Sequence, residues 1–500
     1  MLSDKKIIAR NTIYLYVRMF LTMLVSLYTV RAVLQVLGVV NYGVYNAIGG
    51  VVTSLSFITG VMANASQRFF ALELGKGENN KLNTYFNAIL TIYILLSIII
   101  ILVIEFGGTW FLEQKLTIPE ERMSAAHIVL HMSLATFIVT IVANPFQALL
   151  IANEKMNIYA YVSIIEVSLK LLVVFLLYKS PIDKLVFYSI LIFSITFIVH
   201  SIYVFWCINN TKIKYRIQYK GNEFKDIFSY SSWTLFGTVS GVASIQGSSI
   251  ILNIFCGPIA NTAFAIATQI STVIQQFASS FFTAVRPPLT KSYGAGEYIY
   301  MKKLYHFSNK ALFALTFAVV FPLFVKTEFI LSLWLGEISL YMVCFVRIMM
   351  IYAVVLCLNS PITTIVQAAG KVKMYHLVVD GFSLLVLPCL YLFCKMGLDA
   401  NYCLIVNVLI FSIAHLLRLI VLRKVADFSI SDYCLHFLLP MLFVITLCSI
   451  VIKIVCNAIP DNTFTSLCIM AFSVFLSAGV SFVILFSKDE RQQLISMLRR

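Results

Sequence analysis

The chain has 500 residues, of which 60 % are hydrophobic and 12 % charged, whereas soluble globular chains have about 45–50 % apolar and about 25 % charged residues. This composition excludes a soluble enzyme and indicates a protein that crosses a membrane many times. The net charge of +15 does not indicate a nucleic-acid partner, because the basic residues stand in short clusters between apolar runs, as membrane orientation requires.

Many apolar runs are long enough to cross a bilayer and do not alternate with polar residues, which excludes a β-barrel and predicts an all-α polytopic fold. We expect about 14 transmembrane helices, since one crossing needs roughly 20 apolar residues. The predicted spans are 12–36, 43–73, 84–106, 122–151, 157–178, 184–208, 228–254, 258–287, 305–326, 341–368, 373–395, 400–422, 437–456 and 464–487.

The basic residues predict the orientation of these spans. Of the 37 Lys and Arg residues, 26 lie at the ends and connections on the side of the N-terminus, seven lie on the opposite side and four lie within spans. Because cytoplasmic connections carry the excess of Lys and Arg, we expect both termini in the cytoplasm.

Two matches between the halves predict an internal repeat. LGKGE at 74–78 resembles YGAGE at 293–297, an offset of 219, and a Pro, an Ala and a Lys recur at an offset of 216 (Pro145, Ala152 and Lys155; Pro361, Ala368 and Lys371). We therefore expect two parallel six-helix repeats plus two C-terminal helices, with a cleft between the lobes as in transporters. The predicted boundaries are 1–208 for the N-terminal lobe, 209–227 for a basic cytoplasmic linker, 228–422 for the C-terminal lobe, and 423–500 for two further helices and a cytoplasmic tail.

A stripe of polar residues at helical spacing follows the predicted span 258–287. Its counterpart under the offset of 219 follows the span 43–73, where all six positions are small or polar. Two interpretations fit: small and hydroxyl residues that pack helices together, or the wall of a hydrated cleft. The residues are Thr268, Thr272, Gln275, Ser279, Thr283 and Arg286, and their counterparts Gly49, Thr53, Ser56, Gly60, Asn64 and Gln67.

Four arginines are candidates for binding an anionic substrate. Arg18 lies within the first span, where an arginine costs about 2.5–3.5 kcal/mol on insertion scales and so favours a bundle interior or a wet cavity. Arg68 and Arg286 lie near the cytoplasmic ends of their spans, where an ordinary snorkelling flank is the alternative. Arg347 maps to His131 under the offset of 216, and the two are candidates for an outer anion site.

Two carboxylates within spans are candidates for ion coupling, Glu166 and Asp380. Glu166 precedes Lys170 by four residues, so a self-neutralised ion pair is the alternative for that residue. We expect no metal site, since no acid or cysteine accompanies His127 and His131 in their span. No phosphate-binding loop occurs, and we expect no catalytic residue and no cofactor.

The segment NTIYLYVRMFLTMLVSLYTVRAVLQVLGVVNYGVYNAIGG, followed by SQRFFALELGKGE, resembles the N-terminal signature of bacterial polysaccharide flippases. These are the O-antigen and capsule unit translocators of the multidrug/oligosaccharidyl-lipid/polysaccharide exporter superfamily. The detailed resemblance covers roughly the first 80 residues, and the helix plan covers the whole chain. It implies that the protein moves an undecaprenyl-pyrophosphate-linked glycan across the bacterial cytoplasmic (inner) membrane by alternating access, with polysaccharide polymerase and other synthesis proteins as partners. It also implies basic residues in a central cavity, a role that Arg18, Arg68 and Arg286 fit by placement.

Two other functions remain as alternatives. A multidrug efflux antiporter of the same superfamily would need acids in the cleft to bind cationic drugs, and the spans at 12–36, 43–73, 228–254 and 258–287 have none at mid-depth. A membrane polysaccharide polymerase or ligase would need a large periplasmic loop, and no predicted outer loop exceeds about twenty residues.

Overall fold

The computed structural model describes residues 2–53, 56–77, 79–114, 118–180, 182–211, 216, 221–335, 338, 341–460 and 462–492. Every regular element in these residues is a helix. Eleven of the described helices are long and apolar enough to cross a membrane, so the protein is a multi-pass membrane protein. The chain divides into two compact units, residues 10–232 and residues 233–500 with 1–9, each with a hydrophobic core of its own.

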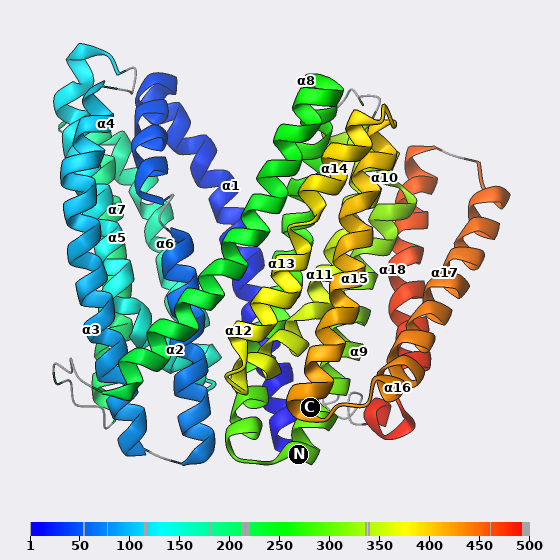
Figure 1. Ribbon diagram of the computed structural model, residues 1–500. Helices are drawn as coiled ribbons and strands as arrows, with labels where there is room; N and C mark the ends of the chain where they lie inside the picture. Colours follow the sequence, from blue (N-terminus) through cyan, green and yellow to red (C-terminus); the bar gives the residue numbers. More distant parts are fainter. Residues whose placement is uncertain are drawn as a thin grey trace. The chain divides into compact units, whose positions relative to one another are not determined.

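The N-terminal unit is built from α1 to α7 and the first turns of α8 (Figure 1). Within it, α5 packs against α2, α3 and α7, and α6 packs against α7. The elements are α1 (Leu2–Thr53), α2 (Ser56–Lys76), α3 (Asn79–Val103), η1 (Ile104–Gly108), α4 (Thr109–Gln114), η2 (Glu120–Arg122), α5 (Met123–Ala152), α6 (Met156–Tyr178) and α7 (Lys184–Asn210).

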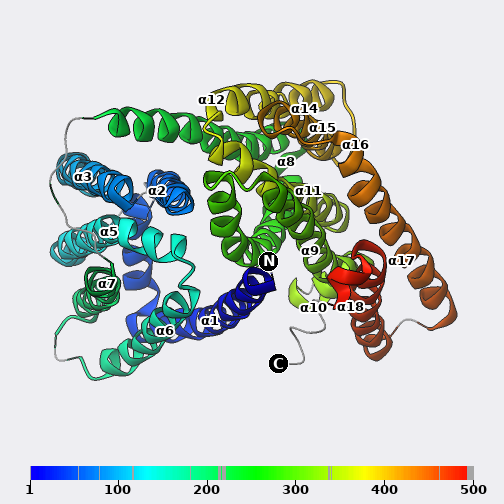
Figure 2. The same cartoon turned by 90° about the horizontal axis from the view of Figure 1, so that it is seen from below.

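The C-terminal unit contains the rest of α8 and all later elements. In this unit α11 packs against α9 and α15, and the last pair, α17 and α18, joins through α18 to α9 (Figure 2). The elements are α8 (Asn222–Gly294), α9 (Tyr298–Val325), α10 (Thr327–Leu335), α11 (Met342–Ala368), α12 (Val372–Tyr375), η3 (His376–Asp380), α13 (Gly381–Ser383), α14 (Val386–Lys395), α15 (Ala400–Ala426), α16 (Ile430–Tyr433), η4 (Cys434–Leu438), α17 (Leu439–Ala458) and α18 (Thr463–Leu485).

The backbone shows the internal repeat at the offset of 219 that the sequence predicts. Gly38 (φ 77°, ψ 164°) bends α1, and Gly257 (φ 80°, ψ −178°), its equivalent at that offset, bends α8. Gly77 (φ 73°) and Gly296 (φ 75°), which follow α2 and α8, are equivalent at the same offset. Only glycine adopts such dihedrals at low cost, so the two halves share the same bends at equivalent positions.

The second offset, 216, also has a backbone signature. Glu154 (φ 61°) follows α5, and its equivalent at that offset, Gly370 (φ 76°), follows α11. Pro145 and Pro361 lie inside the same two helices, as the sequence match predicts. The prediction of an all-α polytopic fold is therefore confirmed, and these equivalent glycine and proline positions support the predicted repeat.

The helix boundaries differ from the prediction in two places. The predicted break between the spans 12–36 and 43–73 is present at Gly38, where the backbone is not helical, but the predicted span 43–73 is divided between the end of α1, at Thr53, and α2, which begins at Ser56. The predicted spans 228–254 and 258–287 correspond to the two segments of α8, which meet at Gly257, where the backbone is again not helical. The short helix α10 was not predicted, because its nine residues are too few to cross a bilayer. The count of fourteen spans remains a prediction.

Candidate functional site

The polar stripe of α8 lies on the surface of its own unit. Thr272 and Ser279 are exposed and Gln275 is half-buried, whereas the neighbouring Ile274 and Ala278 are buried in the unit. The threonine hydroxyl of Thr272 donates to the carbonyl of Thr268 at 2.9 Å, a bond within one helix. The stripe therefore does not pack into the core of the C-terminal unit.

The matching residues of α2 also stay out of the core. Asn64, Gln67 and Arg68 share one face of the helix and are all half-buried. The guanidinium carbon of Arg68 lies 4.6 Å from the ring centroid of Phe69 and 4.8 Å from that of Tyr230. These cation–π contacts hold the charge of Arg68, within α2, near the first turns of α8 in the N-terminal unit. The side chains of Thr53 and Ser56 lie outside the described residues.

Arg18 of α1 is held against α6. Its Nε donates to Oγ of Ser163 at 2.7 Å, and its guanidinium carbon lies 4.2 Å above the ring centroid of Tyr159. The side chain is half-buried, and it forms no ion pair among the described residues. Arg18 is therefore a cation fixed by neutral groups, so its charge stays available to an anion.

The sequence placed Arg18 on a polar face of its helix but did not identify its partners. Ser163 and Tyr159 show no signal in the sequence beyond their spacing on α6. The partners of Arg18 and Arg68 differ: the first contacts α6, and the second contacts Phe69 and Tyr230.

The candidate arginines of the C-terminal unit lie in different places. Arg286 follows the α8 stripe and lies half-buried with its guanidinium carbon 5.8 Å from the ring centroid of Phe282. Arg347 is on α11, where its Nε donates to Oγ1 of Thr327 at 3.4 Å. The structure thus places Arg286 with Gln275 on α8, and Arg347 apart from both.

His131 has a carboxylate beside it. Its Nδ1 lies 3.1 Å from Oε1 of Glu105 on η1. A carboxylate at this distance repels an anion, which counts against His131 as part of the outer anion site suggested with Arg347.

Of the two coupling candidates, Glu166 has the partner that its spacing predicts. Nζ of Lys170 lies 2.6 Å from Oε1 of Glu166, one turn apart on α6. Both side chains are partly exposed, so the pair is self-neutralised on the surface of the unit.

Asp380 belongs to a buried polar cluster in the C-terminal unit. Its Oδ2 lies 2.6 Å from Nδ1 of His376, and its Oδ1 accepts from Nη2 of Arg418 at 3.4 Å. His376 and Asp380 form the two ends of the π-helix η3, and Arg418 comes from α15. Residue exposure is only 4 % for His376 and 5 % for Arg418.

The cluster continues through hydroxyl groups. Nε of Arg418 donates to the Tyr375 hydroxyl at 2.8 Å, and Thr363 Oγ1 lies 2.8 Å from the same oxygen. His415, one turn before Arg418, lies 2.6 Å from Oδ1 of Asn359. This network links α11, α12, η3 and α15 in one polar core.

Sequence reasoning found Asp380 but missed its partners. Arg418 was counted as a basic flank of the span 400–422, whereas the structure buries it inside α15. The signal that was available is the recurrence of His and a charged residue at helical spacing on successive spans: His376 with Asp380, and His415 with Arg418.

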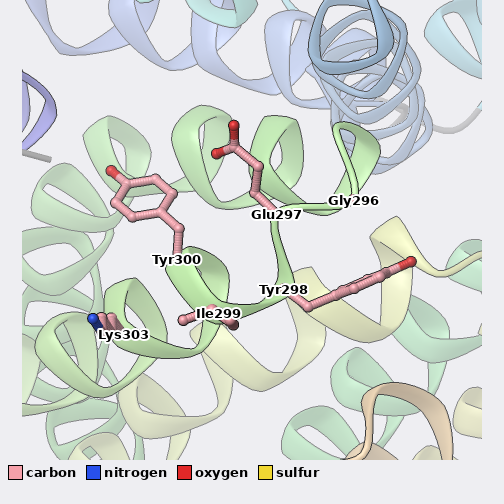
Figure 3. A pocket seen from close by; sticks show the side chains of 6 residues that line it. All are labelled: Gly296, Glu297, Tyr298, Ile299, Tyr300 and Lys303. Atoms are coloured by element: carbon pink, nitrogen blue, oxygen red, sulfur yellow. The ribbon is translucent and has the colours of Figure 1, made fainter.

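Two cavities lie away from the candidate arginines and the Asp380 cluster, although Gly49 of the small-and-polar stripe lines one of them. One of about 380 Å³ lies at the turn between α8 and α9 and is lined by Gly296, Glu297, Tyr298, Ile299, Tyr300 and Lys303. Figure 3 shows that the side chains of Tyr298 and Tyr300 point in different directions there. Another, of about 210 Å³ in the N-terminal unit, is lined in part by hydroxyls of α5 and α7, and none of the candidate arginines lines either cavity. In the described part of the chain, no three His, Cys, Asp or Glu side chains gather as a metal site.

Comparison with known proteins gives matches to two families. The polysaccharide biosynthesis protein family matches residues 8–293, more than half of the chain, and the MatE family matches residues 238–392. The uncharacterized membrane protein EpsK of Bacillus subtilis is 21 % identical over 296 residues, which cover 58 % of this chain. The chain spans 57 % of the length of EpsK in that match.

Solved structures of similar fold are transporters. A MATE protein in the straight conformation superposes with a TM-score of 0.72 at 15 % identity, covering 85 % of this chain and 96 % of that one. A MOP superfamily transporter from Pyrococcus furiosus, described as having a binding pocket of reversed polarity, superposes with a TM-score of 0.70 at 15 % identity, covering 85 % and 97 %. At these identities the likeness shows a common fold.

Proposed function

The chain belongs to the polysaccharide biosynthesis protein family of the MOP superfamily of transporters, and from this premise we propose that it is a flippase for a lipid-linked glycan. Its substrate would be an undecaprenyl-pyrophosphate-linked oligosaccharide destined for a surface polysaccharide. The protein would take the pyrophosphate and sugars from the cytoplasmic leaflet and release them at the other leaflet by alternating access.

The observation that carries this proposal is the environment of Arg18. A pyrophosphate bears about two negative charges, and an arginine binds two phosphate oxygens in a fork. Ser163 and Tyr159 orient the guanidinium of Arg18 without neutralising it. We propose that Arg18 is the first contact of the pyrophosphate, with Arg68 and Arg286 as further cationic sites.

The polar stripes supply groups for the sugars. Asn64, Gln67 and Gln275 have amide groups that both donate and accept hydrogen bonds, as sugar hydroxyls require. All three are half-buried on helices whose polar faces lie outside the core of their own unit. We propose that they contact the sugars, and that Arg347 lies on the outward path of the glycan.

The surroundings follow from the same proposal. The excess of Lys and Arg on one side supports a location in the bacterial cytoplasmic membrane with both termini in the cytoplasm. The natural partners would be the proteins that synthesise the lipid-linked unit and the polymerase that consumes it.

Export of a cationic drug is the second candidate, since the structural neighbours include multidrug MATE transporters. The sequence of α8 argues against export of a cationic drug. Between Asp226 and Arg286 there is no Asp, Glu, Lys, Arg or His, and a stretch without acids offers no counter-charge to a cation.

Disruption of the gene tests the proposal in the host. We expect loss of the surface polysaccharide and accumulation of the polyprenyl-pyrophosphate oligosaccharide, both restored by the wild-type chain. A normal surface polysaccharide in the disrupted strain, together with sensitivity to cationic dyes, would instead support drug export.

Cysteine scanning tests the role of the α8 stripe. We expect cysteines at Thr272 and Ser279 to react with water-soluble maleimides in opened membranes, and matched cysteines at Ile274 and Ala278 to be protected. Equal protection of all four positions would show that the stripe packs against protein or lipid.

A further inference from the structure

The α8 helix covers the His376–Asp380 pair at very close range. A Cβ built on Gly237 would lie 2.4 Å from Nδ1 of His376 and 2.5 Å from Oδ2 of Asp380. No side chain fits at this position, so the backbone of α8 lies directly on the pair. Under the repeat offset of 219, the residue equivalent to Gly237 is Arg18.

The tyrosines near these two positions, on α6 and α12, are equivalent as well. Tyr159, on which Arg18 stacks, corresponds at the offset of 216 to Tyr375, which accepts a hydrogen bond from Arg418. In each repeat an arginine therefore contacts the equivalent tyrosine, but the arginine comes from a different helix: α1 in the first repeat and α15 in the second. The glycine in the second repeat leaves room for the His376–Asp380 pair.

The hydrogen bonds of Asp380 determine the tautomer of His376. Oδ1 of Asp380 accepts from Arg418, and Oδ2 lies 2.6 Å from Nδ1 of His376; a carboxylate that accepts at both oxygens requires the tautomer of His376 with its hydrogen on Nδ1. The lone pair of a neutral His376 is then on Nε2. This atom is buried and has no hydrogen-bond partner among the described residues.

We propose that Nε2 of His376 is the binding site for the proton that drives transport. The inference rests on the proposed function, because it names the ion that energises that flippase. With His376 neutral, the charges of Asp380 and Arg418 cancel. Binding of a proton at Nε2 gives the cluster one net positive charge. The step is reversible protonation, and no other bond forms or breaks.

The groups around His376 make this extra charge costly while α8 stays in place. The charged and titratable groups in contact with the pair are Tyr375, whose ring lies against His376, and Arg418, which hydrogen-bonds to Tyr375 and Asp380. Lys373 on α12, His415 on α15 and Tyr433 on α16 are the titratable groups on the neighbouring elements. From α8 comes the backbone at Gly237, which brings no further acid, so the single carboxylate of Asp380 would be shared by two cations, the imidazolium and Arg418. Displacement of α8 admits water to the charge, so protonation favours a state in which α8 has moved.

The polar stripe from Thr268 to Arg286 lies on the second segment of α8, which joins the segment of Gly237 directly at Gly257. In this proposal, a displacement at Gly237 is passed through that junction to the residues proposed to contact the glycan, and this couples the proton site to the glycan.

The test uses the purified full chain in liposomes with a fluorescent polyprenyl-pyrophosphate oligosaccharide. Coupling to one proton predicts that a gradient of one pH unit changes the final distribution of the glycan about tenfold, and that reversing the gradient reverses the change. His376→Asn keeps a donor for Asp380 but has no titratable nitrogen, so it should flip the glycan without dependence on the gradient. His376→Gln serves as a second variant if the first does not fold.

His200→Asn is the matched control, because Nδ1 of His200 also bonds a group one turn away on its own helix, the carbonyl of Thr196 at 2.8 Å, as Nδ1 of His376 bonds Asp380. It should keep the dependence on the gradient. Gradient dependence that persists in both His376 variants, or a wild type that flips the glycan equally under all gradients, would overturn the proton site and leave the flippase function standing.

A second readout needs no glycan. Trp233 on α8 lies 5.4 Å from Nζ of Lys373, so its fluorescence, taken as the difference from Trp233→Phe, reports the contact of α8 with α12. We expect it to change with pH in the wild type and in His200→Asn but not in His376→Asn. A pH-dependent Trp233 signal in a protein that flips no glycan would support the proton site and overturn the proposed flippase function. A wild-type signal that does not change with pH would overturn the proton site.

Discussion

Substitution of Gly257 by alanine tests whether the bend in α8 is required by the fold. Gly257 has φ 80° and ψ −178°, a region of backbone space that is essentially restricted to glycine. A Cβ there would meet no atom within 4 Å, so any cost comes from the backbone conformation and not from a clash. Such residues cost about 1–3 kcal/mol, and we expect Gly257→Ala to lower the free energy of unfolding by that amount.

Packing on both sides of Gly257 prevents α8 from relieving the backbone strain by straightening. Leu252 before Gly257 and Ala260 after it are both fully buried in the same hydrophobic core. If α8 straightened at Gly257, one of the two segments would leave that core. We therefore expect the loss to appear as reduced stability, with the helix content unchanged.

Gly241→Ala is the matched control on the same helix. Gly241 is helical and also has no atom within 4 Å of a built Cβ, so alanine should be neutral or stabilising by up to about 1 kcal/mol. The assay is unfolding of each purified protein in mixed detergent micelles at increasing fractions of sodium dodecyl sulfate, followed by circular dichroism. Equal stability of Gly257→Ala and Gly241→Ala would refute the reasoning.

Three further predictions concern other contacts. Arg18→Ala should reduce glycan export roughly 10- to 100-fold at normal membrane abundance, since a charged hydrogen bond contributes about 1.5–3 kcal/mol, and Arg18→Lys should be intermediate; undiminished export by Arg18→Ala would remove Arg18 from the site. Asp183 caps α7 by accepting from the N–H groups of residues 185 and 186, so Asp183→Ala should lower the unfolding free energy by about 0.5–2 kcal/mol and Asp183→Asn by less, measured by the same assay. Burial raises the pKa of the Glu490 carboxyl, but the N–H of Ser487 and the Lys310 ammonium, 3.0 Å away, lower it more, so the pKa lies below its ordinary value of 4.5. The stabilisation is therefore present above pH 4.5 and lost as the pH falls through the lowered pKa, so Glu490→Gln should be less stable than wild type at pH 7 and equal to it at strongly acidic pH.

The sequence predicts the fold class well, because the length of the apolar runs indicates the helices and the matches between the two halves indicate the repeat. The Pro145 and Pro361 pair and the two LGKGE-like turns mark equivalent positions, and the structure gives both turns a glycine of positive φ, Gly77 and Gly296. The predicted breaks at Gly38 and Gly257 are single residues of non-helical backbone and not loops, a distinction that the sequence does not make, since a glycine between two apolar runs is consistent with either.

The site was less predictable because its contacts are distant in sequence. Arg18 and Ser163 are 145 residues apart, and Arg418 and Asp380 lie on helices separated by a loop. Hydropathy identifies a charge within a span, but only the packed structure shows whether that charge is neutralised, as Asp380 is, or stacked on a neutral ring, as Arg18 is.

The most direct test of the central claim is transbilayer movement of a defined lipid in liposomes that contain only this protein. The substrate is a fluorescent undecaprenyl-pyrophosphate oligosaccharide, and its accessibility on the outer leaflet is followed with an impermeant quencher. The account predicts rapid movement with the wild-type chain, movement slowed roughly 10- to 100-fold with Arg18→Ala, and no acceleration of a cationic dye. Movement no faster than in protein-free liposomes, or transport of the dye in place of the glycan lipid, would contradict it.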